Sequence, residues 1–118
     1  MNDAEKHFGE KLKFQIDPTG LEHAIKEGKG DCVIVDVRGR NAYKDGHIPG
    51  AIDIPIEELS GRMGELPKDK TIYIYCYNIV CFRAPKAAYA LAQNGFEHVV
   101  EVFGGYEEWQ RRGHPVDK

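Results

Sequence analysis

The chain has 118 residues, of which 42% are hydrophobic, and this composition is sufficient for the buried core of one domain. Its 16 basic and 19 acidic side chains give a formal net charge of −3, so we expect neither a nucleic-acid partner nor a membrane-surface partner. No apolar run is long enough to span a bilayer, and the polar first residues lack the apolar stretch of a signal peptide.

The first half of the chain alternates between helical and strand periods. In chain order, we expect a helix over Asp3–Lys13, a strand over Phe14–Ile16, a helix from Pro18 to Gly28 or Gly30, and a strand over Val33–Val37. The first helix is amphipathic, and we expect residues 1–13 to form a helical extension of a domain that occupies residues 14–118. Residues 38–51 are punctuated by glycine and proline, which is typical of a structured loop.

The second half of the chain continues the same alternation. We expect a short strand over Ile52–Ile54, a helix from Pro55 towards Met63, a strand over Thr71–Tyr75, a loop over Cys76–Cys81, a helix over Phe82–Asn94, a strand over Val99–Val102 and a closing helix over Tyr106–Arg112. Strands that alternate with helices predict an α/β fold, with a central parallel sheet and helices on both of its faces.

The loop from Cys76 to Cys81 is the most informative segment. An alternating, β-rich run ends at Cys76, and a helix-forming run begins shortly after Cys81. A cysteine at a strand end that faces the N-terminus of the next helix is stabilised as a thiolate by the helix dipole and by loop N–H groups. We therefore expect sulfur chemistry at Cys76; the alternative is a buried thiol that packs as a small hydrophobic side chain.

Three stretches of this sequence resemble the single-domain rhodaneses, the thiosulfate sulfurtransferase-like proteins. They are Asp36-Val-Arg38 with Tyr43-Lys-Asp-Gly-His47-Ile-Pro-Gly-Ala51 and Ile54-Pro55; the strand, Cys76 loop and helix described above; and Gly104-Gly-Tyr-Glu-Glu-Trp109 with Gly113-His-Pro-Val116. Their order and spacing make the match specific over most of the chain. The resemblance implies a rhodanese-like parallel sheet with the active loop at the carboxyl end of a central strand.

The resemblance also implies a mechanism. Cys76 takes a sulfane sulfur from a donor, thiosulfate or a persulfide, and passes it from a Cys76 persulfide to a thiol or cyanide acceptor. Backbone N–H groups of the substrate-binding loop surround that sulfur, and this loop consists of Tyr77, Asn78, Ile79, Val80 and Cys81. A protein sulfur carrier is a further candidate partner, and we expect neither a metal nor an organic cofactor.

The loop departs from the family pattern in two respects. Many rhodaneses carry glycine, serine, arginine or lysine there, whereas residues 77–80 are Tyr, Asn, Ile and Val. Because cationic side chains are missing, we expect weak saturation with thiosulfate, which is a dianion. The second departure is Cys81, which is either a resolving thiol that attacks the Cys76 persulfide or a small side chain whose S–H group bonds weakly to the Cys76 sulfur.

Asp36, Arg38 and Arg83 are candidate accessory residues. Asp36 and Arg38 lie at the end of a buried strand, where α/β folds place their sites, and the family pattern puts them close to the active loop. The alternative, which we favour, is a structural ion pair that orders the following turn. Arg83 either attracts an anionic donor or is a solvated residue of its helix.

Other functions fit the sequence less well. A cysteine phosphatase or arsenate reductase of related fold needs an arginine six residues after the cysteine, and that position is Phe82. A non-enzymatic rhodanese-like interaction or sulfur-relay module typically lacks the cysteine, although the apolar loop also suits protein docking. Cys76 and Cys81 have no further ligands at a spacing that suits zinc, and no glycine-rich phosphate motif follows a strand.

The cysteine content indicates the cellular setting. Three cysteines are an odd number and too few for a disulfide scaffold. Cys32, at the start of a strand, is expected to be an inert thiol. We therefore expect a reducing, cytoplasmic location.

Overall fold

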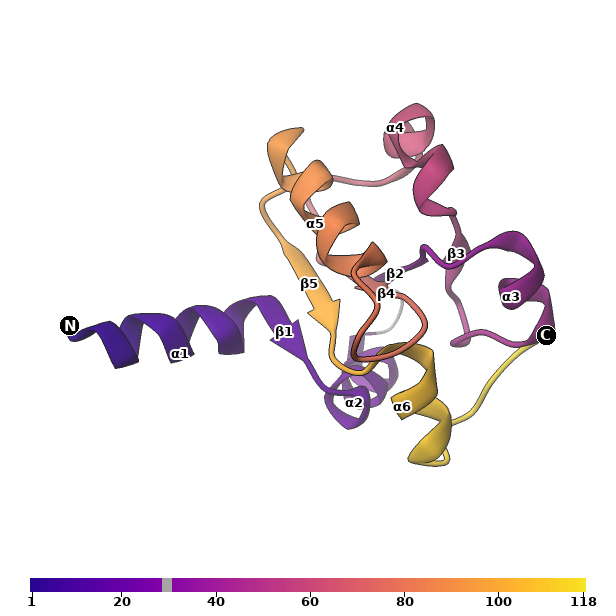
Figure 1. The fold of residues 1–118 in the computed structure, drawn as a ribbon, viewed down its shortest axis with the longest axis horizontal. Helices are drawn as coiled ribbons and strands as arrows, with labels where there is room; N and C mark the ends of the chain where they lie inside the picture. The colour runs from indigo at the N-terminus through magenta and orange to yellow at the C-terminus, as the bar shows by residue number, and fades with distance from the viewer. Residues whose placement is uncertain (29–30) are drawn as a thin grey trace.

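The structure, a computed structural model, describes residues 1–28 and 31–118 (Figure 1). Its strands are β1 (Gln15–Ile16), β2 (Val33–Asp36), β3 (Ile52–Asp53), β4 (Ile72–Tyr75) and β5 (Val99–Val102). Its α-helices are α1 (Asp3–Phe14), α2 (Pro18–Gly28), α3 (Arg40–Asp45), α4 (Leu59–Arg62), α5 (Arg83–Gln93) and α6 (Gly105–Arg111). Two 3₁₀ turns, η1 (Ile56–Glu58) and η2 (Met63–Glu65), flank α4.

The strands form one parallel sheet in the order β1-β5-β4-β2-β3. This confirms the expected α/β fold with a central parallel sheet. From β4 the chain continues to β5 on one side, whereas from β2 it continues to β3 on the other side. The carboxyl ends of β2 and β4 therefore meet at the point where the winding direction changes, which is where parallel α/β sheets place their sites.

Buried side chains form two clusters, one on each face of the sheet. In β4, Ile74 points to the cluster that packs against α4 and α5, whereas Tyr75 points to the cluster that includes Leu21 of α2 and Trp109 of α6. Figure 1 shows α4 and α5 above the sheet and α2 and α6 below it. Because side chains alternate along a strand, Cys76 belongs to the first cluster and points towards α5.

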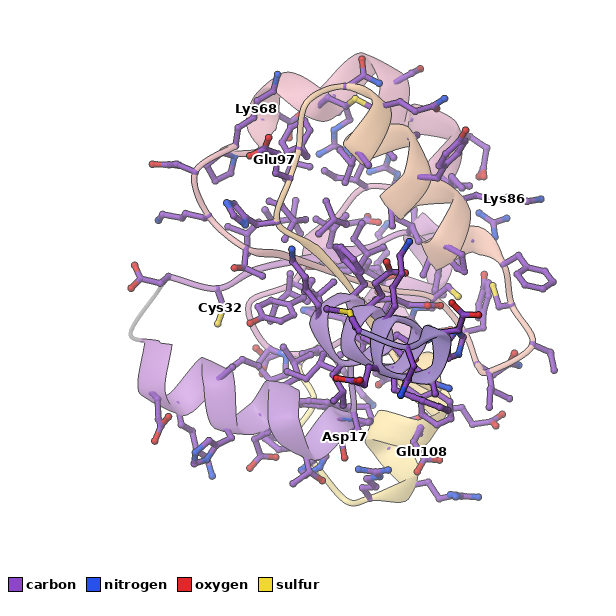
Figure 2. All side chains as sticks on the ribbon, turned by 90° about the vertical axis from the view of Figure 1, so that its left-hand side faces the viewer. Asp17, Cys32, Lys68, Lys86, Glu97 and Glu108 are labelled. Atoms are coloured by element: carbon purple, nitrogen blue, oxygen red, sulfur yellow. The ribbon has the colours of Figure 1, made fainter. Side chains whose placement is uncertain are left out.

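Helix α2 packs beside α6 on the lower face. Arg112, directly after α6, binds Asp17 at 2.8 Å and Glu108 at 2.9 Å; both acidic residues are labelled in Figure 2. Helix α2 is described as far as Gly28, and the alternative end at Gly30 lies outside the described residues. These contacts fix α6 against the body of the molecule, and α6 in turn holds the Cys76 loop.

Helix α1 extends away from the sheet (Figure 1) and has no buried residue. The expected helix is confirmed, but it includes Phe14, so strand β1 begins one residue later than expected. A capping box explains its start: Asn2 accepts from the Glu5 N–H at 2.8 Å, and the Glu5 carboxylate reaches back to the Asn2 N–H. The division into an extension of residues 1–13 and a domain of residues 14–118 stays a prediction.

Two segments differ from the sequence expectations. Residues 38–51, expected to be a loop, contain helix α3, which spans only six residues and is too short to show a helical period in the sequence. The helix expected from Pro55 towards Met63 is divided into η1, α4 and η2. This segment contains Gly61, a weak helix former, and short turns of this kind are held by packing rather than by propensity.

Candidate active site

Cys76 is the first residue after β4 and lies at the base of the loop that leads to α5. Its side chain is 3% exposed. The Cys76 thiol donates to the carbonyl oxygen of Cys81, with 3.4 Å between sulfur and oxygen. The backbone N–H groups of Ala84 and Tyr77 lower the pKa of the same thiol. The predicted position of the thiol, facing the start of the next helix, is therefore present in the structure.

The ionisation of Cys76 differs from the sequence expectation. Burial, the largest cause, and the hydrogen bond with the Cys81 thiol raise the pKa of Cys76 well above that of an ordinary thiol. The N–H groups of Ala84 and Tyr77 act in the opposite direction, but they do not compensate for burial. Burial of Cys76 therefore opposes the thiolate expected from the backbone dipoles.

Cys81 carries the negative charge more readily than Cys76. Burial raises the pKa of Cys81, but hydrogen bonds from the Cys76 thiol and from the N–H groups of Arg83 and Tyr77 outweigh burial, and the pKa is lowered. Cys81 is half-buried, and its interaction with the Cys76 thiol moves their two pKa values in opposite directions.

We predict that iodoacetamide alkylates Cys81 before Cys76 at pH 7. The thiolate is the reactive form, so a lowered pKa accelerates the reaction of Cys81, whereas burial and a raised pKa slow that of Cys76. As the pH rises towards the pKa of Cys76, its thiolate fraction grows about tenfold per pH unit. Timed digestion and peptide mass spectrometry give both initial rates, with Cys32 as internal reference. Faster labelling of Cys76 at pH 7 would contradict this assignment of the charge.

The loop presents its apolar side chains to solvent. Tyr77, Ile79 and Val80 are 41%, 64% and 76% exposed. Asn78 organises the turn, because its side-chain oxygen accepts from the Val80 N–H at 3.1 Å and its carbonyl accepts from the Cys81 N–H at 3.2 Å. The loop thus begins at a buried cysteine and exposes apolar side chains at its tip.

Helix α6 anchors the loop through backbone hydrogen bonds. This structural role of α6 was not predicted from the sequence. The N–H groups of Tyr106 and Glu107 donate to the carbonyl oxygens of Cys76 and Tyr77, at 2.9 and 3.0 Å. Gly105, with a left-handed φ of +62°, allows this approach, since a Cβ atom there would lie 2.5 Å from the Cys76 carbonyl oxygen. In the sequence, this Gly104–Gly105 pair was noted only as part of a stretch that resembles the rhodaneses.

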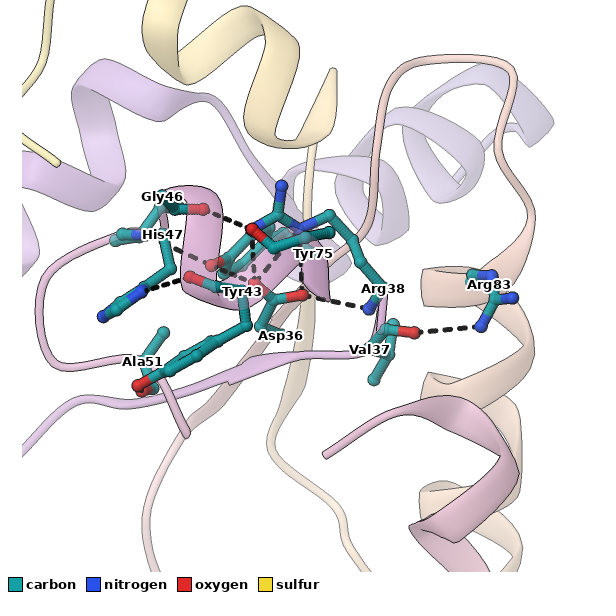
Figure 3. Close-up of polar contacts among 11 residues, drawn as sticks. Asp36, Val37, Arg38, Tyr43, Gly46, His47, Ala51, Tyr75 and Arg83 are labelled. Carbon is teal, nitrogen blue, oxygen red and sulfur yellow. Dashed lines mark hydrogen bonds and ion pairs between the residues drawn. The ribbon is translucent and has the colours of Figure 1, made fainter. Parts of the chain in front are cut away.

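Asp36 and Arg38 form a buried ion pair beside the loop (Figure 3). The Arg38 Nη2 atom lies 2.7 Å from Asp36 Oδ2, and Tyr75 donates its hydroxyl to the same oxygen at 2.7 Å. Arg38 also donates to the Gly46 carbonyl at 2.6 Å. This pattern agrees with our favoured interpretation, an ion pair that orders the following turn.

The guanidinium of Arg38 also connects this ion pair to the active loop. It lies 4.2 Å from the ring centre of Tyr106 and 5.9 Å from that of Tyr77. These are cation–π distances, so Arg38 supports one residue of the loop and one residue of its anchor. No hydrogen bond joins Arg38 to Cys76 among the described contacts.

Arg83 opens helix α5 at the edge of the site. Its guanidinium binds the Glu57 carboxylate at 2.8 Å and donates to the Val37 carbonyl at 3.3 Å, the latter bond drawn in Figure 3. Its side chain is therefore neither fully solvated nor free of a counter-charge. The attraction that it offers to an anionic donor is reduced by Glu57.

The remaining candidate positions lie elsewhere. Cys32 donates to the Ala24 carbonyl at 3.4 Å, and Figure 2 shows it beside helix α2, well separated from α5. Across the described ranges, no group of three or more His, Cys, Asp or Glu side chains is arranged to hold a metal ion. Within the same residues, no helix combines the length and the apolar character needed to cross a membrane.

The fold and the site together define an α/β domain with a thiol loop at the switch point of a parallel sheet. The Rhodanese-like domain family matches residues 17–112. The sulfurtransferase of Allochromatium vinosum is 32% identical over 102 residues, which are 86% of this chain and 92% of that protein. The BH2092 protein of Bacillus halodurans, a crystal structure, has a TM-score of 0.91 at 39% identity and covers 98% of this chain and 85% of its own.

This chain belongs to the rhodanese-like domain family, and the resemblance found in the sequence is confirmed. The family also includes proteins of other kinds. The HTH-type transcriptional regulator Rv0324 of Mycobacterium tuberculosis is 43% identical over 100 residues, which are 85% of this chain but only 44% of the regulator.

Proposed function

We propose that this protein is a sulfurtransferase that carries a sulfane sulfur as a persulfide on Cys76. The position of the Cys76 sulfur is the observation that supports this most. It lies after a central strand, at the switch point of the sheet, and the N–H groups of Tyr77 and Ala84 favour its negative charge by lowering its pKa. Fixed N–H donors of this kind stabilise the negative charge that develops on sulfur during transfer.

In the first half-reaction, the Cys76 thiol loses its proton to water while its sulfur attacks the outer sulfur of the donor. With thiosulfate, the S–S bond of the donor breaks, sulfite leaves with the electron pair, and Cys76 keeps the sulfane sulfur. A persulfide donor leaves as its thiolate.

In the second half-reaction, an acceptor attacks the outer sulfur of the Cys76 persulfide. A thiol acceptor becomes a persulfide, or cyanide becomes thiocyanate, and Cys76 leaves as a thiolate. Because the sulfur is held covalently between the two steps, ping-pong kinetics follow.

The surroundings of the loop favour uncharged or protein-bound sulfur over thiosulfate. Residues 77–80 carry no cationic side chain, and Glu57 neutralises Arg83 at 2.8 Å. The exposed side chains of Ile79, Val80 and Phe82 form an apolar rim instead. Apolar patches of this kind are typical of protein contacts, so we propose a protein thiol, such as a sulfur carrier, as donor or acceptor.

The geometry does not favour a phosphatase or arsenate reductase. The position that must carry the oxyanion-binding arginine is Phe82, which is 70% exposed. Arg83, the next residue, directs its guanidinium to Glu57 and to the Val37 carbonyl. A tetrahedral oxyanion would therefore meet no bidentate arginine in this loop.

Formation of thiocyanate from thiosulfate and cyanide tests the proposal. We expect wild type to form equal amounts of thiocyanate and sulfite, and Cys76→Ser to show only the uncatalysed background. Cys32→Ser is the matched control and should equal wild type, because Cys32 lies beside α2. Rates that rise almost linearly with thiosulfate would agree with the missing loop cations. Equal rates for Cys76→Ser and wild type would refute the proposal.

A further inference from the structure

Two of the three cysteines lie in the same short loop, and all three are free. The Cys76 thiol donates to the Cys81 carbonyl oxygen at 3.4 Å, and the Cys81 side chain packs against the buried cluster that contains Cys76. The turn that begins at Asn78 brings Cys81 back over the base of the loop, because the Cys81 N–H donates to the Asn78 carbonyl at 3.2 Å. A second sulfur nucleophile is thus held beside the first.

We propose that Cys81 resolves the Cys76 persulfide when no acceptor is bound, so that the protein also releases hydrosulfide at the expense of an external thiol. This inference rests on the sulfurtransferase function proposed above. The Cys81 thiolate attacks the inner sulfur of the persulfide, the bond between inner and outer sulfur breaks, and the outer sulfur leaves as hydrosulfide. A disulfide between Cys76 and Cys81 remains. Two equivalents of an external thiol reduce it and are themselves joined as a disulfide.

The unequal burial of the two cysteines favours attack from within the loop. The inner sulfur of the persulfide is that of Cys76, which is 3% exposed, so an external thiol has little access to it. Cys81 packs against the cluster that contains Cys76, and a neighbouring group of this kind reacts at a high effective concentration. Once the disulfide has formed, the half-buried Cys81 sulfur is the one that an external thiol reaches first.

The charge distribution supports the same direction of attack. Burial raises the pKa of Cys81. Interactions with the Cys76 thiol and with the N–H groups of Arg83 and Tyr77 lower it by more than burial raises it. Cys81 therefore supplies a thiolate more readily than a buried thiol without such bonds. A serine at this position keeps a small hydroxyl that hydrogen-bonds to the Cys76 sulfur but cannot displace sulfide, so Cys81→Ser separates packing from attack.

The test is one cycle with thiosulfate, in the absence of any acceptor or reductant. Thiosulfate is used at high concentration because it supplies no free sulfide of its own. Wild type, Cys81→Ser, Cys76→Ser and Cys32→Ser are compared by intact mass under non-reducing conditions, and released sulfide is measured at the same time. Circular dichroism and thermal unfolding confirm that each variant is folded.

We expect wild type and Cys32→Ser to release one equivalent of sulfide and to lose about 2 Da, with a disulfide between Cys76 and Cys81 in the peptide map. Cys81→Ser should instead keep one added sulfur, about 32 Da, and release none. Cys76→Ser should show neither change. If wild type and Cys81→Ser both keep the added sulfur, resolution by Cys81 is refuted while the sulfurtransferase function stands. If no variant gains sulfur or releases sulfide, both proposals are refuted.

Discussion

Replacement of Asp36 by alanine is expected to lower the free energy of unfolding by about 3–5 kcal/mol. The substitution removes the carboxylate that pairs with the Arg38 guanidinium. Arg38 is only 4% exposed. It also removes the acceptor of the buried Tyr75 hydroxyl. An uncompensated charge in the interior costs more than a lost surface contact, because the group can neither reach water nor lose its proton. Urea unfolding followed by circular dichroism measures the effect.

Two further variants make this prediction specific. Glu57→Ala breaks the exposed ion pair with Arg83 and should cost little, because water and salt already screen that contact. The double variant Asp36→Ala/Arg38→Met should be more stable than Asp36→Ala alone, since it removes the orphaned charge together with its partner. A loss below about 1 kcal/mol for Asp36→Ala would contradict the description of a tightly coupled buried pair.

Gly105→Ala is expected to slow sulfur transfer by about 100-fold, the loss that a displacement of reacting groups by about 1 Å produces. The new Cβ atom would lie 2.5 Å from the Cys76 carbonyl oxygen and 2.9 Å from the Asn78 backbone nitrogen. Both neighbours are backbone atoms, so no side-chain rotation relieves the clash. The loop must move away from α6, and the N–H groups that face the Cys76 sulfur move with it.

Gly113→Ala is the matched control for this prediction. Gly113 also has a left-handed φ, +77°, but a Cβ atom there meets nothing within 4 Å. Both variants therefore carry the same kind of backbone strain, about 1–2 kcal/mol, whereas only Gly105→Ala displaces the loop. Thermal unfolding should show a larger loss of stability for Gly105→Ala, because the clash adds to the shared strain, and thiocyanate formation should slow strongly for Gly105→Ala only. Equal rates for the two variants would show that α6 does not position the loop.

Much of the fold follows from local pattern. Strand β5 spans Val99–Val102 as predicted, because a β-branched run between polar segments is a strong local signal. Helix α5 begins at Arg83 and holds Pro85 in its first turn, where the missing N–H costs nothing. Helix α3 was missed because six residues after a glycine carry no periodic signal, and only packing around the buried Arg38 holds them.

The site was predicted less completely than the fold. The order of motifs was sufficient to find Cys76, its loop and the Asp36–Arg38 pair, which the structure brings to the same edge of the sheet. Gly105 was not recognised, because its contact with Cys76 joins segments that the sequence separates by a helix and a strand. A pair of glycines at the start of a helix was the available signal, and it had a simpler explanation as a strand end.

The sequence by itself determined the order of helices and strands, the family and the position of Cys76 after a central strand, because propensities and motifs are local properties of the chain. Only the tertiary structure decided the direction in which the pKa of each thiol in the loop is shifted. That outcome depends on how deeply packing against α5 buries Cys76 and on which N–H groups reach Cys81. Burial and hydrogen bonding are sums over neighbours that are distant in the chain, so residue order alone does not contain them.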